Sequence, residues 1–199
     1  MSRAIDYYFA TQSPWAFLGH ERFVQLLRAS RREVNVWPVD YGRVFAASGG
    51  LPLPRRAPQR QAYRLLELRR FAEHLGVSMH VQPAHFPVDG TRSSLLITAV
   101  ARHDGMDAAL ALAGAVFAAC WREQRDIASD STLAELLHEC DLPPERLRDA
   151  QAGDTRLRYD AHTQAAIDAG VFGAPTYVID GELFWGQDRL DFVARKLAL

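Results

Sequence analysis

The last thirty residues of the chain carry the pattern that most restricts its fold. Within residues 170–197, two runs rich in aromatic and β-branched side chains, at 177–179 and 183–185, are separated by an Asp-Gly pair at 180–181. Such a pair between such runs is typical of a β-hairpin, because both turn residues must tolerate a positive φ. A helix is expected to follow from about Gln187. The chain is therefore predicted to end in a β-β-α unit.

A proline stands just before the first of these strands. Pro175 has no N–H to donate to a strand ladder, so it belongs at the start of a strand or at a bend. If its peptide bond were cis, the backbone of Ala174 would form an unpaired edge that an extended ligand could join. The sequence does not decide this point, because only about 5–6% of X–Pro bonds in folded proteins are cis.

The start of the chain predicts a β-α-β unit. Residues 4–10 have the apolar, aromatic character of a short buried strand. Ser13 and Pro14 then open a helix, because serine is a favoured N-cap and proline fits the first helical position. A second strand is expected at 33–39, and residues 41–58 resemble a loop. Ser13 is thus predicted to lie at a corner between a strand and a helix.

The middle of the chain has helical periodicity throughout, and a capping-box pattern occurs at Thr132 and Glu135. Helices are expected at 59–75, 91–103, 107–123, 132–139, 143–152 and 154–169. Residues 59–169 are therefore predicted to form a helical insertion that covers one side of the sheet as a lid. Residues 1–58 and 170–199 together are predicted to form the sheet-containing domain.

Composition excludes several classes of function. The formal net charge of −1 argues against nucleic-acid binding, which needs a basic surface. The sequence has no signal-peptide pattern and no uncharged apolar run long enough to span a membrane, so we expect a cytoplasmic protein without a membrane partner. Cys120 and Cys140 form no CxxC motif and are expected to be small buried hydrophobes. The seven histidines form no metal-ligand pattern, so no metal site is predicted.

The C-terminal segment also carries a family resemblance. Residues 170–190, GVFGAPTYVIDGELFWGQDRL, resemble the C-terminal signature of the 2-hydroxychromene-2-carboxylate isomerases. These are glutathione-dependent members of the DsbA-like, kappa-class glutathione transferase branch of the thioredoxin superfamily. The resemblance implies an α/β, thioredoxin-like fold (β-α-β followed by β-β-α) with a large all-helical insertion. It also implies glutathione as cofactor and a homodimer.

Ser13 is the candidate catalytic residue. The oxidoreductase relatives carry the first cysteine of CxxC at this corner, whereas here the four residues read Ser-Pro-Trp-Ala, so no dithiol redox cycle is possible. A hydroxyl at the positive end of a helix suits a thiolate that another molecule brings, and it would lower the pKa of that thiol. The resemblance gives Ser13 this contact with the glutathione sulfur. The alternative is that Ser13 is only an N-cap, which contributes about 1 kcal/mol to the helix.

The resemblance also places the rest of glutathione. The main chain of Ala174 would pair with the cysteinyl backbone, beside a cis Pro175. The segment Trp185-Gly186-Gln187-Asp188 would hold the γ-glutamyl end, with backbone amides on its carboxylate and Asp188 on its ammonium group. Gln187 stands where the family usually has asparagine, which preserves an amide. On the sequence alone, Gly186 is a turn residue and Asp188 a carboxylate at a helix start.

The substrate side departs from the family pattern. The positions that correspond to the family's lysine and Asn-Arg pair are Phe45 and Arg55-Arg56, and Phe86 corresponds to its tyrosine. Arg56 could hold a carboxylate, although exposed arginines in loops are usually only solvated. We therefore expect an aromatic or unsaturated carboxylate as substrate, and the loss of two polar contacts leaves open whether it is the hydroxychromene itself.

Three functions are consistent with these residues. The first is a glutathione-dependent cis-trans isomerase of an aromatic-degradation intermediate, in which the thiolate adds reversibly to the substrate. The second is a kappa-class-like glutathione transferase or peroxidase, which would consume the thiol. The third is a thioredoxin-like binding module without catalysis, for which replacing Ser13 would change no rate.

Overall fold

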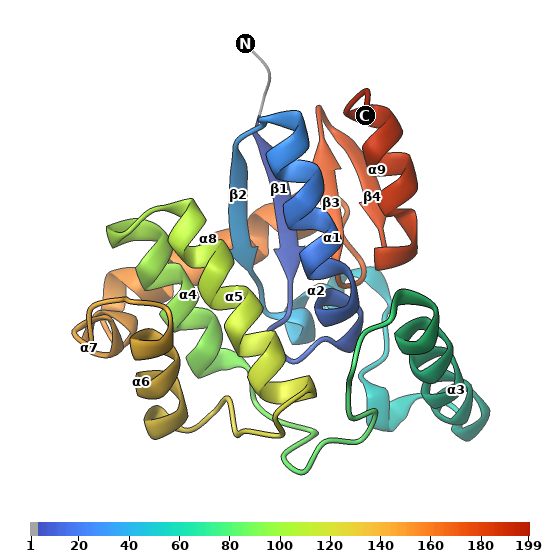
Figure 1. Cartoon of the computed structure of the whole chain (residues 1–199), viewed down its shortest axis with the longest axis horizontal. Coiled ribbons are helices and arrows are strands. Elements are labelled where there is room, and N and C mark those ends of the chain that lie inside the picture. Colours follow the sequence, from blue (N-terminus) through green and yellow to red (C-terminus); the bar gives the residue numbers. More distant parts are fainter. Residues whose placement is uncertain (1–3) are drawn as a thin grey trace.

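The computed structural model describes residues 4–199 as a mixed four-stranded sheet with helices on both faces (Figure 1). The strand order is β2-β1-β3-β4; β1 is parallel to β2 and antiparallel to β3, and β3 is antiparallel to β4. The strands are β1 (Ile5–Phe9), β2 (Val34–Pro38), β3 (Thr176–Ile179) and β4 (Glu182–Trp185). The first strand therefore joins the C-terminal hairpin, as the β-α-β and β-β-α pattern predicts.

Helices fill most of the remaining chain. They are α1 (Pro14–Ser30), α2 (Tyr41–Ser48), α3 (Pro58–Leu75), α4 (Thr91–His103), α5 (Met106–Trp121), α6 (Asp130–Glu139), α7 (Arg146–Ala150), α8 (Gly153–Asp168) and α9 (Leu190–Lys196), with 3-10 turns η1 (Leu53–Arg55) and η2 (Gln187–Arg189). Each helix predicted from periodicity is confirmed with small shifts of its ends. Within residues 4–199, no helix combines the length and the apolar character that a membrane crossing requires.

Two local predictions are wrong. Residues 41–58 are not a loop throughout, because Asp40 caps α2: its carboxylate accepts a hydrogen bond of 2.8 Å from the amide of Gly42. The prolines and glycines that follow indicate a loop more strongly than this cap indicates a helix. The capping box at Thr132 and Glu135 does not form either, since α6 begins at Asp130 with Ser129 as its N-cap.

One face of the sheet carries the aromatic core of the molecule. Side chains alternate along β1, so Ile5, Tyr7 and Phe9 point to this face and are fully buried. The ring of Tyr7 stacks on Tyr177 of β3 with centroids 5.3 Å apart, and Phe23 of α1 packs against both rings. Strand β2 and the helices α1, α3, α4, α5, α6, α7 and α9 also contribute buried residues to this cluster. The contacts join the two ends of the chain.

The opposite face of the sheet is covered by α2 and α8. Tyr8 of β1 and Val39 pack there against Val44 of α2 and Ala166 of α8. The expectation that the helical segment 59–169 covers one side only is therefore wrong for its last helix, which passes behind the strands in Figure 1. The reason is that β1 and β2 carry apolar side chains on both faces, and both faces must be shielded from water.

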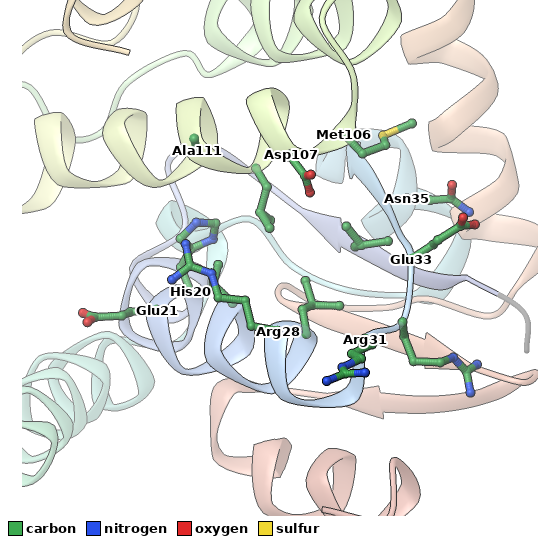
Figure 2. Close-up of a pocket in the computed structure, with 14 residues that line it drawn as sticks. His20, Glu21, Arg28, Arg31, Glu33, Asn35, Met106, Asp107 and Ala111 are labelled. Carbon is green, nitrogen blue, oxygen red and sulfur yellow. The ribbon is translucent and has the colours of Figure 1, made fainter. Parts of the chain in front are cut away.

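A hollow of about 980 Å³ lies between the C-terminal half of α1, the start of β2 and the first turns of α5. Figure 2 shows Arg28 of α1 and Arg31, the residue after this helix, on one wall and Asp107 of α5 on the other. His20 lies at its edge, and burial lowers the pKa of this imidazole to about 4, so it is neutral at pH 7. No residue predicted to bind glutathione or substrate lines this hollow.

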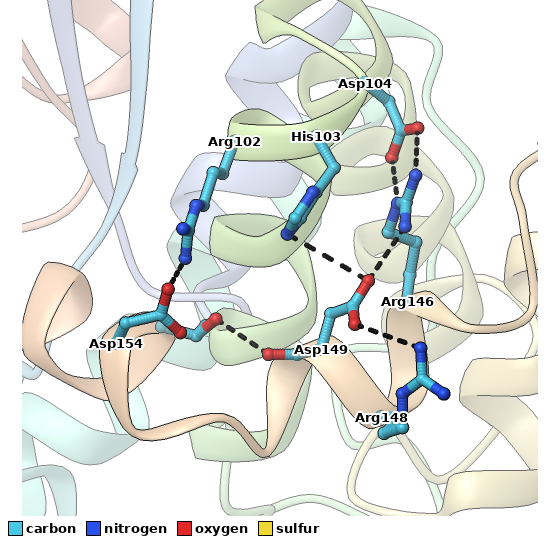
Figure 3. Close-up of polar contacts among 8 residues, drawn as sticks. Arg102, His103, Asp104, Arg146, Arg148, Asp149 and Asp154 are labelled. Carbon is cyan, nitrogen blue, oxygen red and sulfur yellow. Dashed lines mark hydrogen bonds and ion pairs between the residues drawn. The ribbon is translucent and has the colours of Figure 1, made fainter.

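A polar network ties α4 to α7 and α8 (Figure 3). The guanidinium of Arg146 donates two hydrogen bonds to Asp104, of 2.6 and 2.9 Å, and a third of 2.8 Å to Asp149. Arg102 pairs with Asp154 at the start of α8. The Arg146 and Asp104 side chains are only 14% and 16% exposed, and the hydrogen bonds from Arg146 hold the pKa of Asp104 below its usual value. This network therefore fixes the short helix α7.

We expect Arg146→Met to lower the free energy of unfolding by about 2 kcal/mol, because it leaves a largely enclosed carboxylate without its donors. Arg146→Lys should recover only part of this loss, since lysine cannot form the bidentate contact. Arg148, whose side chain is 83% exposed, provides the control: Arg148→Met should cost less than about 0.5 kcal/mol. Urea denaturation measures all three, and equal losses in Arg146→Met and Arg148→Met would contradict the assignment.

Candidate functional site

Ser13 caps the N-terminus of α1, as predicted. Its backbone is extended (φ −81°, ψ 118°), and its hydroxyl oxygen accepts a 3.2 Å hydrogen bond from the amide of Ala16. Ser13 is 9% exposed, and its hydroxyl hydrogen has no acceptor among residues 4–199. The first turn of α1 contains no acidic residue, so the partial positive charge of the helix end is not offset there. The hydroxyl can therefore donate to an anion.

The loop that leads into Ser13 is anchored to the start of α4. Thr11 is fully buried, and its hydroxyl donates to the carbonyl of Gly90 over 3.1 Å. Ser93, also fully buried, donates to the Thr11 hydroxyl over 2.8 Å. A Cβ at position 90 would lie 2.3 Å from the Thr11 hydroxyl oxygen and 2.2 Å from the side-chain oxygen of Gln12. Only glycine at position 90 allows this close approach.

Gly90→Ala should therefore displace the loop and lower the free energy of unfolding by about 1 to 3 kcal/mol, the usual cost of overpacking. Gly153 gives a matched control, because a Cβ there would meet no atom within 4 Å. Gly153→Ala should leave stability within about 0.5 kcal/mol of the wild type. Both variants are compared by thermal and urea denaturation. The account of the loop is incorrect if Gly90→Ala is as stable as Gly153→Ala.

The loop before β3 presents the second part of the site. The Ala174-Pro175 bond is cis, as the resemblance implies. The carbonyl of Gly173 accepts hydrogen bonds from the Tyr41 hydroxyl (2.9 Å) and the Thr176 hydroxyl (2.6 Å), and the Pro175 carbonyl accepts one from the amide of Gly186. Ala174, which is half-buried, makes no backbone hydrogen bond to the rest of residues 4–199. Its N–H and C=O are thus available to an extended ligand.

A cleft of about 650 Å³ runs between this loop and α3. It is lined by six of the residues predicted as ligand contacts: Arg56, Ala174, Trp185, Gly186, Gln187 and Asp188. Trp15, in the first turn of α1, also lines it, which places the Ser13 end of the helix beside the cleft. Trp15 stacks edge-to-face on Phe71 of α3 with centroids 5.8 Å apart. The structure thus brings the first helix, the hairpin and α3 together around one space.

Gln187 occupies an unusual position in this cleft. It is 2% exposed, yet neither atom of its side-chain amide has a hydrogen-bond partner among the described residues. A buried amide without partners costs about 1–3 kcal/mol. Gly19 of α1 makes the position possible, because a Cβ there would lie 2.7 Å from the Cβ of Gln187. Its side-chain amide is therefore a buried donor and acceptor without a partner, in a residue that lines the cleft.

The remaining predicted site residues do not line the cleft. Ser13 and Pro175 are buried next to lining residues. Arg55 is exposed and does not line the cleft. Phe45 and Phe86 do not line it either; each packs beside an arginine of the cleft. The Phe86-Pro87 bond is also cis, which the sequence does not predict.

Sequence reasoning missed the wall that α3 forms. The lining residues of this wall are Gln59, Arg60, Tyr63, Arg64, Glu67 and Phe71, and Arg189 joins them from the other side. One signal is present in the sequence: Arg60 and Arg64 are four residues apart, which places them on one side of the predicted helix. Arg56 precedes this helix.

The chain's own thiols do not belong to the site. Cys120 and Cys140 are both free, and neither lines the cleft. Burial raises the pKa of Cys120 to about 12, and it also raises the pKa of Cys140. Neither thiol is therefore a good source of thiolate at neutral pH. Among residues 4–199, no group of three or more His, Cys, Asp or Glu side chains is placed to hold a metal ion.

Comparison with known proteins adds to this geometry. A family model, the DSBA-like thioredoxin domain, matches residues 4–198. The 2-hydroxychromene-2-carboxylate isomerase of Pseudomonas putida is 30% identical over 94% of this chain and 90% of its own length. Glutathione S-transferase kappa 1 of Caenorhabditis elegans is 23% identical over 97% of this chain and 90% of its own length.

A solved structure of 2-hydroxychromene-2-carboxylate isomerase superposes on this chain with a TM-score of 0.85 at 26% sequence identity. The match covers 98% of this chain and 95% of that structure. The four-stranded sheet and the helices around it therefore have the same arrangement in both proteins.

Proposed function

Because this chain belongs to the DSBA-like thioredoxin domain family, and within it to the 2-hydroxychromene-2-carboxylate isomerases, we propose that it is a glutathione-dependent cis-trans isomerase. The observation that carries the proposal is the Ser13 hydroxyl. It stands at a helix N-terminus with a hydrogen free to donate, in a chain whose own thiols are buried or half-buried. Such a site suits a thiolate that arrives with a small molecule.

Glutathione fits the wall of the cleft formed by the β3 loop and the end of the hairpin. Its cysteinyl backbone would pair with the free N–H and C=O of Ala174, which directs its sulfur toward Ser13. Its γ-glutamyl end would lie at residues 186–188, where the side chain of Asp188 is 43% exposed and can accept from an ammonium group. The unpartnered amide of Gln187 lies in the same place and offers both a donor and an acceptor.

The chemistry requires only a reversible addition. The thiolate forms a C–S bond with an unsaturated carbon of the substrate, and the electron pair of the double bond moves onto the conjugated carbonyl group. The former double bond is now single and rotates. The electron pair then returns, the C–S bond breaks, and glutathione leaves unchanged while the substrate has isomerised. Ser13 contributes by keeping the sulfur ionised before addition and after its expulsion.

A kappa-class-like transferase or peroxidase is the second candidate, and the likeness to glutathione S-transferase kappa 1 favours it over a binding module without catalysis. It would use the same thiolate and consume it. Chromatography after incubation with glutathione and an unsaturated aromatic 2-oxo acid separates the two. We expect isomerised substrate with all of the glutathione recovered as free thiol. Accumulation of a conjugate or of glutathione disulfide would favour the second candidate instead.

A further inference from the structure

The cleft contains more positive charge than the chain itself balances. Its two carboxylates already have partners: Glu67 pairs with Arg70 over 2.7 Å, and Asp188 with Arg189 over 3.4 Å. The other arginines that line the cleft are Arg56, Arg60 and Arg64, and none of them has an ion-pair partner among residues 4–199.

Arg64 is the most enclosed of the three. Burial, and then the positive charge of Arg56, lowers the pKa of Arg64 to about 10. Burial and the charge of Arg60 likewise lower the pKa of Arg56. Both guanidinium groups line the same cleft and are only partly exposed, so their like charges face one space that is partly shielded from water. An anion between them would remove this repulsion.

Aromatic rings hold both guanidinium groups from behind. The central carbon of the Arg64 guanidinium lies 5.3 Å from the centroid of Phe86 and 6.0 Å from that of Trp121. The corresponding carbon of Arg56 lies 5.9 Å from the centroid of Phe45, and its Nε donates to the carbonyl of Leu51 over 2.8 Å. A guanidinium that lies over a ring can still donate its N–H groups to other partners.

We propose that Arg64 joins Arg56, the arginine that the resemblance already places on the substrate side, to form a clamp for a carboxylate of the second ligand. Phe86 and Phe45 are positioning residues that hold the two guanidinium groups. The assignment to the second ligand rests on the proposed function, in which glutathione occupies the opposite wall, from Ala174 to Asp188. Glutathione bound as thiolate carries an excess of two negative charges, which three unpaired arginines more than balance. The clamp then selects an unsaturated substrate that carries its own carboxylate.

Two glutathione conjugates test the clamp directly. S-benzylglutathione probes the glutathione wall alone, and S-(4-carboxybenzyl)glutathione adds one carboxylate on the side of the arginines. Calorimetry on the wild type should show that the carboxylated conjugate binds about tenfold tighter or more, as expected for a hydrogen-bonded ion pair. In Arg64→Met this ratio should fall to about one while the affinity for S-benzylglutathione stays the same.

Arg69→Met is the matched control, because Arg69 is exposed on the same helix and does not line the cleft. It should keep the wild-type ratio. A ratio near one in the wild type, or an undiminished ratio in Arg64→Met, overturns the proposal. If neither conjugate binds, the glutathione function is overturned. The clamp is then tested separately, by measuring the binding of 4-methylbenzoate to the wild type and to Arg64→Met. Binding of that acid to the wild type but not to Arg64→Met supports the clamp; equal binding to both overturns it.

The positioning role of Phe86 needs a double-mutant cycle. Phe86→Leu should lower the ratio of the two affinities roughly threefold, the effect of losing a cation–π contact. In the Arg64→Met background the same change should have no further effect on the ratio, because the group that Phe86 positions is gone. An equal loss in both backgrounds would mean that Phe86 acts independently of Arg64, which overturns this role.

Discussion

Replacing Ser13 by alanine should raise the pKa of the bound glutathione thiol by about 1 to 2 pH units, the equivalent of one hydrogen bond to a charged group. Turnover should fall about 100-fold, as when a single donor to a developing anion is removed. The reason is that the Ser13 hydroxyl has no acceptor among the described residues and is therefore free to donate to the sulfur in the proposed complex. Thiolate absorbance in the ultraviolet, followed as a function of pH, measures the pKa.

Two further variants separate the N-cap role of Ser13 from its proposed catalytic role. Glycine is a good N-cap and costs only a few tenths of a kcal/mol, so Ser13→Gly should fold normally and still lose the thiolate. Ser13→Thr keeps a hydroxyl and should retain most of the activity. If Ser13→Gly holds glutathione with a wild-type thiol pKa, the hydroxyl does not act on the sulfur.

Phe117→Ala should lower the free energy of unfolding by about 3–5 kcal/mol, the usual cost of removing a buried phenylalanine. Phe117 of α5 is fully buried, and its ring centroid lies 5.4 Å from that of Phe9 in β1 and 5.2 Å from that of His20 in α1. It therefore joins the helical segment to the sheet. Because both share one core, the variant should still unfold in a single transition.

Phe192→Ala is the control for this prediction. Phe192 of α9 is 48% exposed and contacts the guanidinium of Arg195. Its loss should cost about 1 kcal/mol or less. Urea denaturation, followed by both circular dichroism and tryptophan fluorescence, reports helices and core together. Two separate transitions in Phe117→Ala would show instead that the helical segment and the sheet are independent units.

The parts of the fold that the sequence predicts best are those that local chemistry decides. The hairpin follows from the Asp-Gly pair at 180–181, and the start of α1 follows from Ser13 and Pro14. In each case the residues that set the backbone are adjacent in the chain, so the pattern needs no knowledge of distant contacts. Most of the predicted ligand contacts that line the cleft do so for the same reason, because they lie in or beside these elements.

The parts that the sequence misses depend on contacts between distant segments. Arg60 and Arg64 of α3 line the cleft only because the helix packs against Trp15 through Phe71. Phe45 and Phe86 are predicted substrate contacts, yet the structure places them behind Arg56 and Arg64, which are distant in the sequence. No local sequence pattern predicts whether an aromatic side chain lines a cleft or packs against a residue that lines it. Similarly, the packing of α8 on the far face follows from the burial of both faces of β1.

A structure of this protein with glutathione is the most direct test of the account. It should show the sulfur within hydrogen-bonding distance of the Ser13 hydroxyl and the cysteinyl backbone paired with Ala174, with Arg56 and Arg64 left free to receive a second ligand. A sulfur directed away from the first turn of α1, or a peptide bound along the arginines of α3 instead of the β3 loop, would contradict it.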